Sequence, residues 1–179
     1  MAILKVARLG NPVMREKSVS VSLEELCSPE IQELIDNMIM TMREYDGVGL
    51  AAPQVHVSKQ IAVIEVHENK RYPDVPNIPL TVLINPHLKE LSKSVAESWE
   101  GCLSIPDLRG VVPRSESLVC QAMDRKGGSI QIKADGFFAR VIQHEWDHLQ
   151  GKVYLDRMPN FLSLTHLAEF HRFWSNQEK

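Results

Sequence analysis

The sequence predicts an α+β fold in which antiparallel sheets pack around a central helix, with a further helix at the C-terminus. Three observations favour this fold. Two segments have the apolar spacing of amphipathic helices. Several short apolar runs, rich in β-branched residues, have the length of strands. Turn-forming residues join neighbouring runs closely, which is typical of hairpins and not of a parallel, doubly wound sheet.

The first predicted helix covers residues 29–45. Ser28 suits the N-cap, Pro29 fits the first turn, and Glu30 suits the positive end of the helix dipole. The apolar stripe consists of Ile31, Leu34, Ile35, Met38, Ile39 and Met42. Asp46 and Gly47 should end this helix.

Strands are predicted at four short runs: Ile61–Val66, Thr81–Ile84, Leu118–Met123 and Ser129–Lys133. The segment Lys126–Gly128 should connect the last two of them as a hairpin. The proline-rich stretch Tyr72–Pro79 is interpreted as a surface loop.

A second helix is predicted at about 137–150, with Gly151 as its stop signal. Its apolar residues are Phe137, Phe138, Val141, Ile142 and Leu149. Asn160 is expected to cap a final helix that runs to Trp174. The residues expected to dock this final helix are Phe161, Leu164, Leu167 and Trp174.

The length of 179 residues predicts a single catalytic domain, 1–179. The formal charge of −3 gives no reason to expect nucleic acid or an anionic membrane as a partner. No apolar run approaches the roughly 20 residues that span a bilayer. The first residues lack the organisation of a secretory signal, although the sequence leaves open an organellar transit peptide removed from a longer precursor.

Three cysteines, Cys27, Cys102 and Cys120, form an odd set without the spacing of a disulfide framework. A reducing, cytoplasmic compartment is the simplest interpretation. One of these thiols is then available as a metal ligand.

The strongest local signal is the pattern H-E-x-x-H at residues 144–148, inside the second predicted helix. Side chains four residues apart share a helix face, so His144 and His148 can bind one ion. Glu145 can then reach a metal-bound water without being a ligand. The competing interpretation is a chance match on a polar helix face. The apolar periodicity of the helix favours a metal-binding helix.

A catalytic metal needs a third protein ligand and an open position. The extended protease pattern H-E-x-x-H-x-x-G-x-x-H is not completed, because residue 154 is Tyr154. Asp156 and Glu169 are candidate carboxylate ligands downstream. Upstream, the stretch Glu100–Ser104, which contains Cys102, is more suggestive.

Three blocks together resemble the peptide deformylase family in the family's own order. They are GVGLAAPQ at 47–54, EGCLS at 100–104 and QHEWDHL at 143–149. The segments Leu9–Pro12 and Gly151–Arg157 also resemble the family, so the likeness spans almost the whole chain.

The resemblance implies that Cys102, His144 and His148 are the metal ligands and leave the fourth position of a tetrahedral site to water. It favours Fe²⁺ in the cell, with Zn²⁺, Ni²⁺ or Co²⁺ in purified protein. The alternative for Cys102 is a buried free thiol. For Cys120 we expect a core strand residue, and Cys27 is assigned no role.

The activity implied is hydrolytic removal of the formyl group from the N-terminal formylmethionine of nascent polypeptides, with release of formate. Metal-bound water would be the nucleophile and Glu145 the general base and acid. The side chain of Gln54 and the backbone N–H of Leu103 would stabilise the oxyanion. A solvated loop glutamine is the alternative for Gln54.

The substrate-binding residues implied by the resemblance are Gly47, Val48, Gly49, Gly101, Arg109, Phe137 and Val141. The two glycines near residue 48 would pair with the substrate main chain, although an ordinary helix-to-strand turn also explains them. Val48, Phe137 and Val141 would line a methionine pocket, although core packing explains all three as well. Arg109 is expected at the rim through which substrate enters, and Arg114 is expected to pair with Glu100.

Trp146 and Arg140 depart from the commonest family pattern and should affect packing or pocket shape. The other histidines are interpreted as surface or structural residues: His56, His67, His87, His166 and His171. N-formylmethionyl peptides are the expected partners, and the ribosome near its exit tunnel is a further candidate. No nucleic-acid motif and no membrane partner are expected.

Two alternative functions are weighed against this one. A general metallopeptidase must admit residues on both sides of the scissile bond, and the block containing Cys102 argues against it. A catalytically silent metal-binding protein would not need Gln54 and Glu145, both of which are present.

Overall fold

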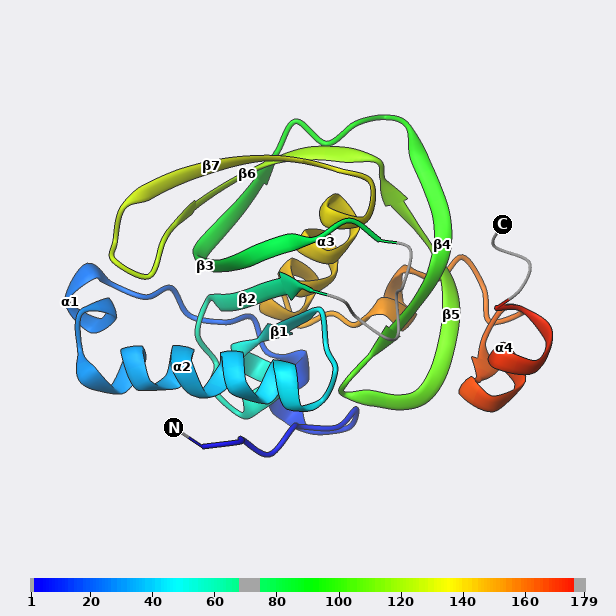
Figure 1. The fold of residues 1–179 in the computed structure, drawn as a ribbon, viewed down its shortest axis with the longest axis horizontal. Helices are drawn as coiled ribbons and strands as arrows, with labels where there is room; N and C mark the ends of the chain where they lie inside the picture. The colour runs from blue at the N-terminus through cyan, green and yellow to red at the C-terminus, as the bar shows by residue number, and fades with distance from the viewer. Residues whose placement is uncertain (1, 68–74, 176–179) are drawn as a thin grey trace.

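The computed structural model describes residues 2–67 and 75–175. It contains two antiparallel sheets with a helix between them, which confirms the predicted α+β class. The first sheet has the order β1-β2-β3-β6-β7 and the second β4-β5-β8. Figure 1 shows α2 along one side of the molecule, α3 behind the strands, and α4 beyond β5.

The strands of the first sheet are β1 (Gly49–Ala51), β2 (Ile61–Val66), β3 (Ile78–Lys89), β6 (Ser117–Met123) and β7 (Ser129–Asp135). Those of the second are β4 (Val95–Cys102), β5 (Ile105–Ser115) and β8 (Thr165–His166). The α-helices are α1 (Leu23–Leu26), α2 (Pro29–Glu44), α3 (Gly136–Leu149) and α4 (Leu167–Phe173). Three short 3₁₀ turns cover Pro12–Arg15, Ala52–Val55 and Tyr154–Arg157.

Helix α2 forms where the sequence predicts it. The Ser28 side chain accepts a hydrogen bond from the backbone N–H of Ile31 and so caps the helix. Its apolar side packs on β1 and β2, where Ile35, Met38 and Met42 are fully buried. This cluster anchors the segment that leads from α2 to β1.

The predicted strands and the hairpin between β6 and β7 are confirmed. One boundary was wrong. The stretch Tyr72–Pro79 was expected to be a surface loop, but Ile78 and Pro79 belong to β3, where Ile78 pairs with Val66. Residues 72–74 lie outside the described part of the chain. The apolar Ile78 side chain is buried, which favours the strand.

Helix α3 lies between the two sheets and contacts strands of both. Its apolar residues Val141, Ile142 and Leu149 are buried. Gly151 follows the helix with a φ of +72°, a conformation that suits glycine and ends the helix as predicted.

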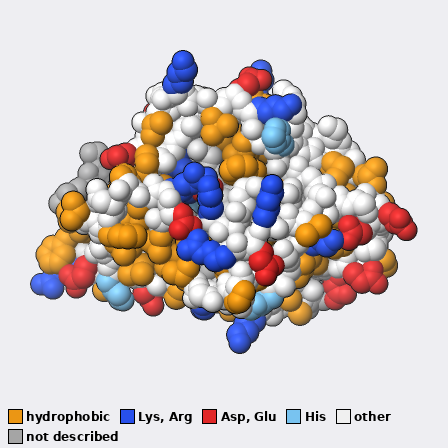
Figure 2. Space-filling view, turned by 180° about the vertical axis from the view of Figure 1, so that it is seen from behind, with side chains coloured by type: hydrophobic (Ala, Val, Ile, Leu, Met, Phe, Trp, Pro, Cys, Tyr) orange, Lys and Arg blue, Asp and Glu red, His pale blue; other side chains and the backbone are white. Residues whose placement is uncertain are grey.

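The C-terminal helix is present but shorter than predicted. Asn160 does not cap it, because its side chain accepts from the backbone N–H of Leu162 in a local turn. Helix α4 starts at Leu167, with His166 as its N-cap. Phe161 is 66% exposed and does not dock. Figure 2 shows hydrophobic side chains gathered at the end of the molecule that carries α4.

Each sheet leaves a particular strand at its edge. Strand β1 is one of the two edge strands of the five-stranded sheet, and β4 is one of the two edge strands of the three-stranded sheet. Both border the pocket described below through Gly49 and through Trp99–Cys102. In the described part of the chain, no helix combines the length and apolar character that crossing a bilayer requires.

Candidate metal centre

A sulfur and two imidazoles meet between α3 and the end of β4. The ligand atoms of Cys102, His144 and His148 lie within 4.8 Å of one another. The Sγ of Cys102 is 3.3 Å from Nε2 of His148. These residues therefore form a cluster that can hold one metal ion.

Helix geometry brings the two histidines together. His144 and His148 are one turn apart on α3, and their ring centroids are separated by 4.9 Å. Cys102 is the last residue of β4, directly after an irregularity in its pairing with β5. The unmatched residues of that irregularity lie on β5, between Ile105 and Gly110, so regular pairing ends beside the thiol.

The His144 ring is oriented by a buried carboxylate. Its Nδ1 lies 2.9 Å from Glu100 Oε2, which leaves Nε2 to face the cluster. Arg114 donates to both oxygens of Glu100, from Nε at 2.9 Å and from Nη2 at 3.0 Å. Burial opposes the charge on Glu100, but the hydrogen bonds from His144 and Arg114 outweigh it and hold its pKa well below the usual range. The pairing of Arg114 with Glu100 is as the sequence predicted.

Two further charged residues extend this network. Arg140 donates from Nη1 to Glu100 at 2.8 Å and also to the carbonyl oxygens of Val112 and Ala96. The Oδ2 of Asp147 accepts from Arg114 Nη1 at 2.5 Å. Arg157 donates to both carboxylate oxygens of Asp147. Because α3, β4 and β5 all contribute to the network, it fixes the ligand helix against the ligand strand.

The donor set fits a divalent metal. Burial alone would raise the pKa of the Cys102 thiol, but its interactions with His148 and His144 lower it well below the usual value. Burial also opposes a charge on His144, yet Cys102 and Glu100 raise the pKa of that ring. A thiolate beside two imidazoles is a ligand set that suits zinc or ferrous iron.

Gln54 directs its amide group at the cluster. The side chain is 1% exposed, and its Oε1 accepts from the backbone N–H of Ala51 at 2.8 Å. Its Nε2 lies 3.4 Å from Cys102 Sγ and 3.3 Å from Ser104 Oγ. The N–H donors of Gln54 therefore point to the metal centre, and a solvated loop position is excluded.

Glu145 is buried beside the cluster. Among the described residues, its Oε2 has no hydrogen-bond partner. A Cβ added at Gly49 would lie 2.3 Å from Glu145 Oε1, so the carboxylate occupies space that only glycine leaves free. Burial raises the pKa of Glu145 to about 7, against the opposing effect of the two histidines. This carboxyl can accept or donate a proton near neutral pH.

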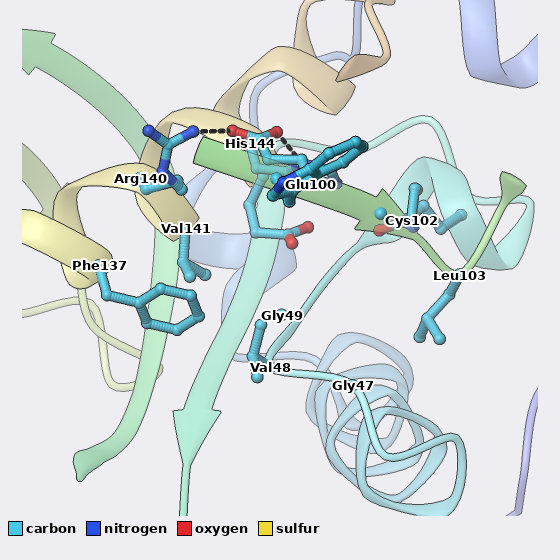
Figure 3. A pocket seen from close by; sticks show the side chains of 14 residues that line it. Gly47, Val48, Gly49, Glu100, Cys102, Leu103, Phe137, Arg140, Val141 and His144 are labelled. Carbon is cyan, nitrogen blue, oxygen red and sulfur yellow. Dashed lines mark hydrogen bonds and ion pairs between the residues drawn. The ribbon is translucent and has the colours of Figure 1, made fainter. Parts of the chain in front are cut away.

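A pocket that is partly open to solvent adjoins the cluster. Phe137 and Val141 from α3 face Val48 across it (Figure 3). Gly47, Gly49, Gly101 and Leu103 also line it. The pocket thus has an apolar part beside the polar metal centre.

Arg109, expected at the rim, lies beside a residue that lines the pocket. It is 7% exposed and lies against Gly101, where a Cβ would come within 1.7 Å of its Nη1. Arg109 is not among the residues that line the pocket. The structure therefore places Arg109 against Gly101, and its role at the rim stays a prediction.

The structure adds residues that the sequence analysis did not predict. Ser104 donates its backbone N–H to Cys102 Sγ at 3.4 Å. Asp147 belongs to the buried network. Arg140, which the sequence predicts to affect packing or pocket shape, both lines the pocket and binds Glu100. A charged residue on the buried side of a predicted helix was the signal that could have identified Arg140.

The alternative ligands and the other cysteines lie elsewhere. Asp156 pairs with Arg15 and accepts from the N–H of Val153, and Glu169 is exposed. Cys120 is fully buried in β6, as expected, and Cys27 is exposed. The five remaining histidines are exposed: His56, His67, His87, His166 and His171.

The chain is similar to known proteins over most of its length. Residues 3–162 match the family described as polypeptide deformylase. Peptide deformylase 2 of Pseudomonas putida is 44% identical over 159 residues, which are 89% of each chain. Peptide deformylase 2 of Nostoc is 37% identical over 177 residues, covering 99% of this chain and 98% of the relative.

Two solved structures have a similar fold. The class I type b peptide deformylase of Acinetobacter baumannii, with Met-Ala-Ser bound, superposes with a TM-score of 0.85 at 39% identity, covering 87% of this chain and 98% of that one. The peptide deformylase of Thermotoga maritima gives a TM-score of 0.79 at 32% identity, covering 88% and 99%.

Proposed function

Because this chain belongs to the peptide deformylase family and is a metal-binding hydrolase that removes formyl groups, we propose how its own residues carry out that reaction on peptides that begin with formylmethionine. The observation that carries the proposal is the convergence of Cys102, His144 and His148 beside a pocket with an apolar wall. The roles below follow from what surrounds each group.

Cys102, His144 and His148 would hold the ion. A divalent metal bound there supplies a water molecule of lowered pKa and shares the negative charge that develops on the formyl oxygen. Glu100 holds the His144 ring in the orientation that presents Nε2. Arg114 and Arg140 in turn hold Glu100.

Glu145 is the general base and acid. Its buried carboxylate accepts the proton of the attacking water and later delivers it to the amine nitrogen as the C–N bond breaks and formate leaves. Support comes from its place on the pocket wall and from the Oε2 that lacks a partner in the described structure.

Gln54 and the backbone N–H of Leu103 donate to the formyl oxygen as it becomes an oxyanion. Gln54 is held for this task, because its Oε1 is fixed by the backbone of Ala51 and its Nε2 faces the cluster. A donor already in place needs no reorganisation when charge develops.

The peptide is bound as an added strand between the two sheets. The β1 edge at Gly49 and the β4 edge at Gly101 border opposite parts of one pocket, and edge strands offer backbone hydrogen-bonding groups. The methionine side chain then enters the apolar part between Val48, Phe137 and Val141. Gly47 and Leu103 complete this wall.

A formate-release assay tests the function. Metal-loaded protein should release formate from formyl-Met-Ala-Ser and leave internal peptide bonds intact. A general metallopeptidase would cleave unformylated peptides, and a silent metal-binding protein would release no formate. Either result would refute the proposal.

We propose Fe²⁺ as the metal in the cell, because a thiolate with two imidazoles suits it and ferrous iron is available in a reducing compartment. Protein purified without oxygen should contain iron and lose activity in air. Reconstitution with Ni²⁺ or Co²⁺ should give air-stable activity. Iron-free anaerobic protein of full activity would contradict this assignment.

The setting proposed for this single catalytic domain is the cytoplasm, where nascent chains leave the ribosome. Three unpaired thiols support a reducing compartment. Sedimentation of the protein with ribosomes, and its loss from them in high salt, would test the association.

A further inference from the structure

The C-terminal segment Ser163–Trp174, here called the C-terminal strap, lies beyond the residues that match the family. It is attached to β5. Strand β8, which belongs to the strap, pairs with β5, so that His166 lies opposite Leu108 and Thr165 lies opposite Arg109. The Ser163 hydroxyl accepts from the backbone N–H of Val111 at 3.0 Å.

The strap also holds an aromatic residue of the pocket. Trp99 lines the pocket from β4. The ring of Phe170 packs edge-on against it, with centroids 5.0 Å apart, and the Trp174 ring lies at 5.8 Å. Phe170 is the buried residue of α4, at 8% exposure. Trp99 is therefore fixed on one side by α4 and open to the pocket on another.

Trp99 lies on the face of β4 that points away from the metal. Glu100 points to the other face, where it binds His144 of α3. Because successive strand residues alternate, Trp99 shares its face with Gly101, against which Arg109 lies. The strap thus supports both β4 and β5 on the outer face of the cleft.

We propose that the strap positions Trp99 as the wall for the side chain of the peptide's second residue, which makes Trp99 a specificity-determining residue. This inference rests on the proposed function, in which the peptide binds as a strand at the β4 edge. When the methionine side chain enters the inner pocket, the next side chain points to the outer face. There it meets Trp99, and an apolar side chain gains from contact with an indole ring.

The experiment compares two substrates that differ only at the second residue, formyl-Met-Leu-Ser and formyl-Met-Gly-Ser. The wild-type protein should have the higher kcat/KM for the leucine peptide. In Trp99→Ala this preference should largely disappear. In Phe170→Ala the leucine-to-glycine ratio should fall about twofold to tenfold, in line with the loss of one aromatic contact. The change should lie in KM for the leucine peptide.

Variants around Phe170 separate positioning from general damage. Phe170→Tyr keeps the ring and should keep the ratio. The double variant Trp99→Ala with Phe170→Ala should be no less selective than Trp99→Ala alone, because Phe170 acts through Trp99. Leu162→Ala, at a side chain 93% exposed just before the strap, is the matched control and should leave both substrates unchanged.

A folded Phe170→Ala protein with the wild-type ratio, or one that slows both peptides equally, would overturn the inference. If Phe170→Ala does not fold, the leucine-to-glycine ratio of Trp99→Ala decides the question. A wild-type ratio in Trp99→Ala would overturn the inference. Affinity of the product peptides Met-Leu-Ser and Met-Gly-Ser, measured by calorimetry, gives a second readout that needs no turnover. Absence of formate release in the wild type would refute the proposed function, while these affinities would still test the role of Trp99.

Discussion

The carboxylate of Glu145 occupies the space that a side chain at residue 49 would need. A Cβ added at Gly49 would lie 2.3 Å from Glu145 Oε1. The glycine on β1 and the carboxylate on α3 are thus complementary in shape. Replacing one should displace the other.

Gly49→Ala should lower kcat about 10- to 100-fold, because a shift of about 1 Å in a reacting group costs on that order. Metal content and melting temperature should change little. Steady-state kinetics with formyl-Met-Ala-Ser measures the effect. In the Glu145→Gln background the same change should add almost nothing, and wild-type kcat in Gly49→Ala would contradict the argument.

Glu145→Gln should lower kcat by about 10²- to 10⁴-fold, the usual contribution of a general base. The metal should stay bound, because Glu145 is not in the ligand cluster. Formate release and metal analysis on the same sample check both parts. Glu97→Gln, at an exposed position of β4, is the matched control. Undiminished turnover in Glu145→Gln would remove it from the mechanism.

Arg140→Met should destabilise the fold by about 2–4 kcal/mol, because a buried carboxylate, a buried carbonyl and a half-buried carbonyl each lose a charged donor. Denaturant unfolding of the metal-free protein measures this loss. Arg43→Met, which removes a half-exposed pair with Glu65, should cost less than about 1 kcal/mol. Equal effects of the two variants would show that the buried network adds no stability.

Metal removal should expose a second thiol. In loaded protein at pH 8, iodoacetamide should label the exposed Cys27 alone, because the proposed metal ion would be bound to Cys102. After chelation Cys102 should react too, while Cys120 stays unlabelled because burial raises its pKa to about 11. Mass mapping counts the labels, and Cys27→Ser should show none before chelation and one after it. Equal labelling of Cys102 in both states would exclude it as a ligand.

The pair of Arg43 and Glu65 should give a small pH dependence of stability. The hydrogen bond from Arg43 lowers the pKa of Glu65 in the folded protein. A carboxyl of lowered pKa stabilises the fold above its unfolded pKa of about 4.3, and this contribution is lost as the pH falls through the folded value. Unfolding curves of wild type and Glu65→Gln should therefore differ at pH 6 and converge in acid. A gap that widens in acid would reverse the sign.

Helices α2 and α3 were predictable because each carries an apolar stripe and a residue that marks one of its ends, Ser28 for α2 and Gly151 for α3. Strands β4 and β5 were not, since their buried faces carry Glu100 and Arg114. These two charges look solvent-exposed in sequence and become buried by pairing with each other. The start of the C-terminal helix was wrong because Phe161 suggested a docking face and is exposed instead.

The three motif blocks identified most of the residues that surround the pocket, although their catalytic roles stay predictions. The sequence could not predict the contact of Arg109 with Gly101, because that contact depends on how β5 pairs with β4. The contacts of Arg140 and Trp99 are with residues distant along the chain: Arg140 binds the carbonyl of Ala96, and Trp99 packs against Phe170. The pairing of Trp99 with Phe170 leaves no local pattern in the sequence, whereas the charge of Arg140 on the buried side of a predicted helix is a local signal.

Cys102 and His148 are 46 residues apart along the chain, one at the end of strand β4 and the other in helix α3. An ion bound between them acts as a reversible cross-link across that loop. Its binding free energy then adds to the free energy of unfolding, because the unfolded chain cannot assemble the same three ligands. Loss of the ion would accordingly loosen the junction of the two sheets, and the thermal midpoint would depend on free metal concentration.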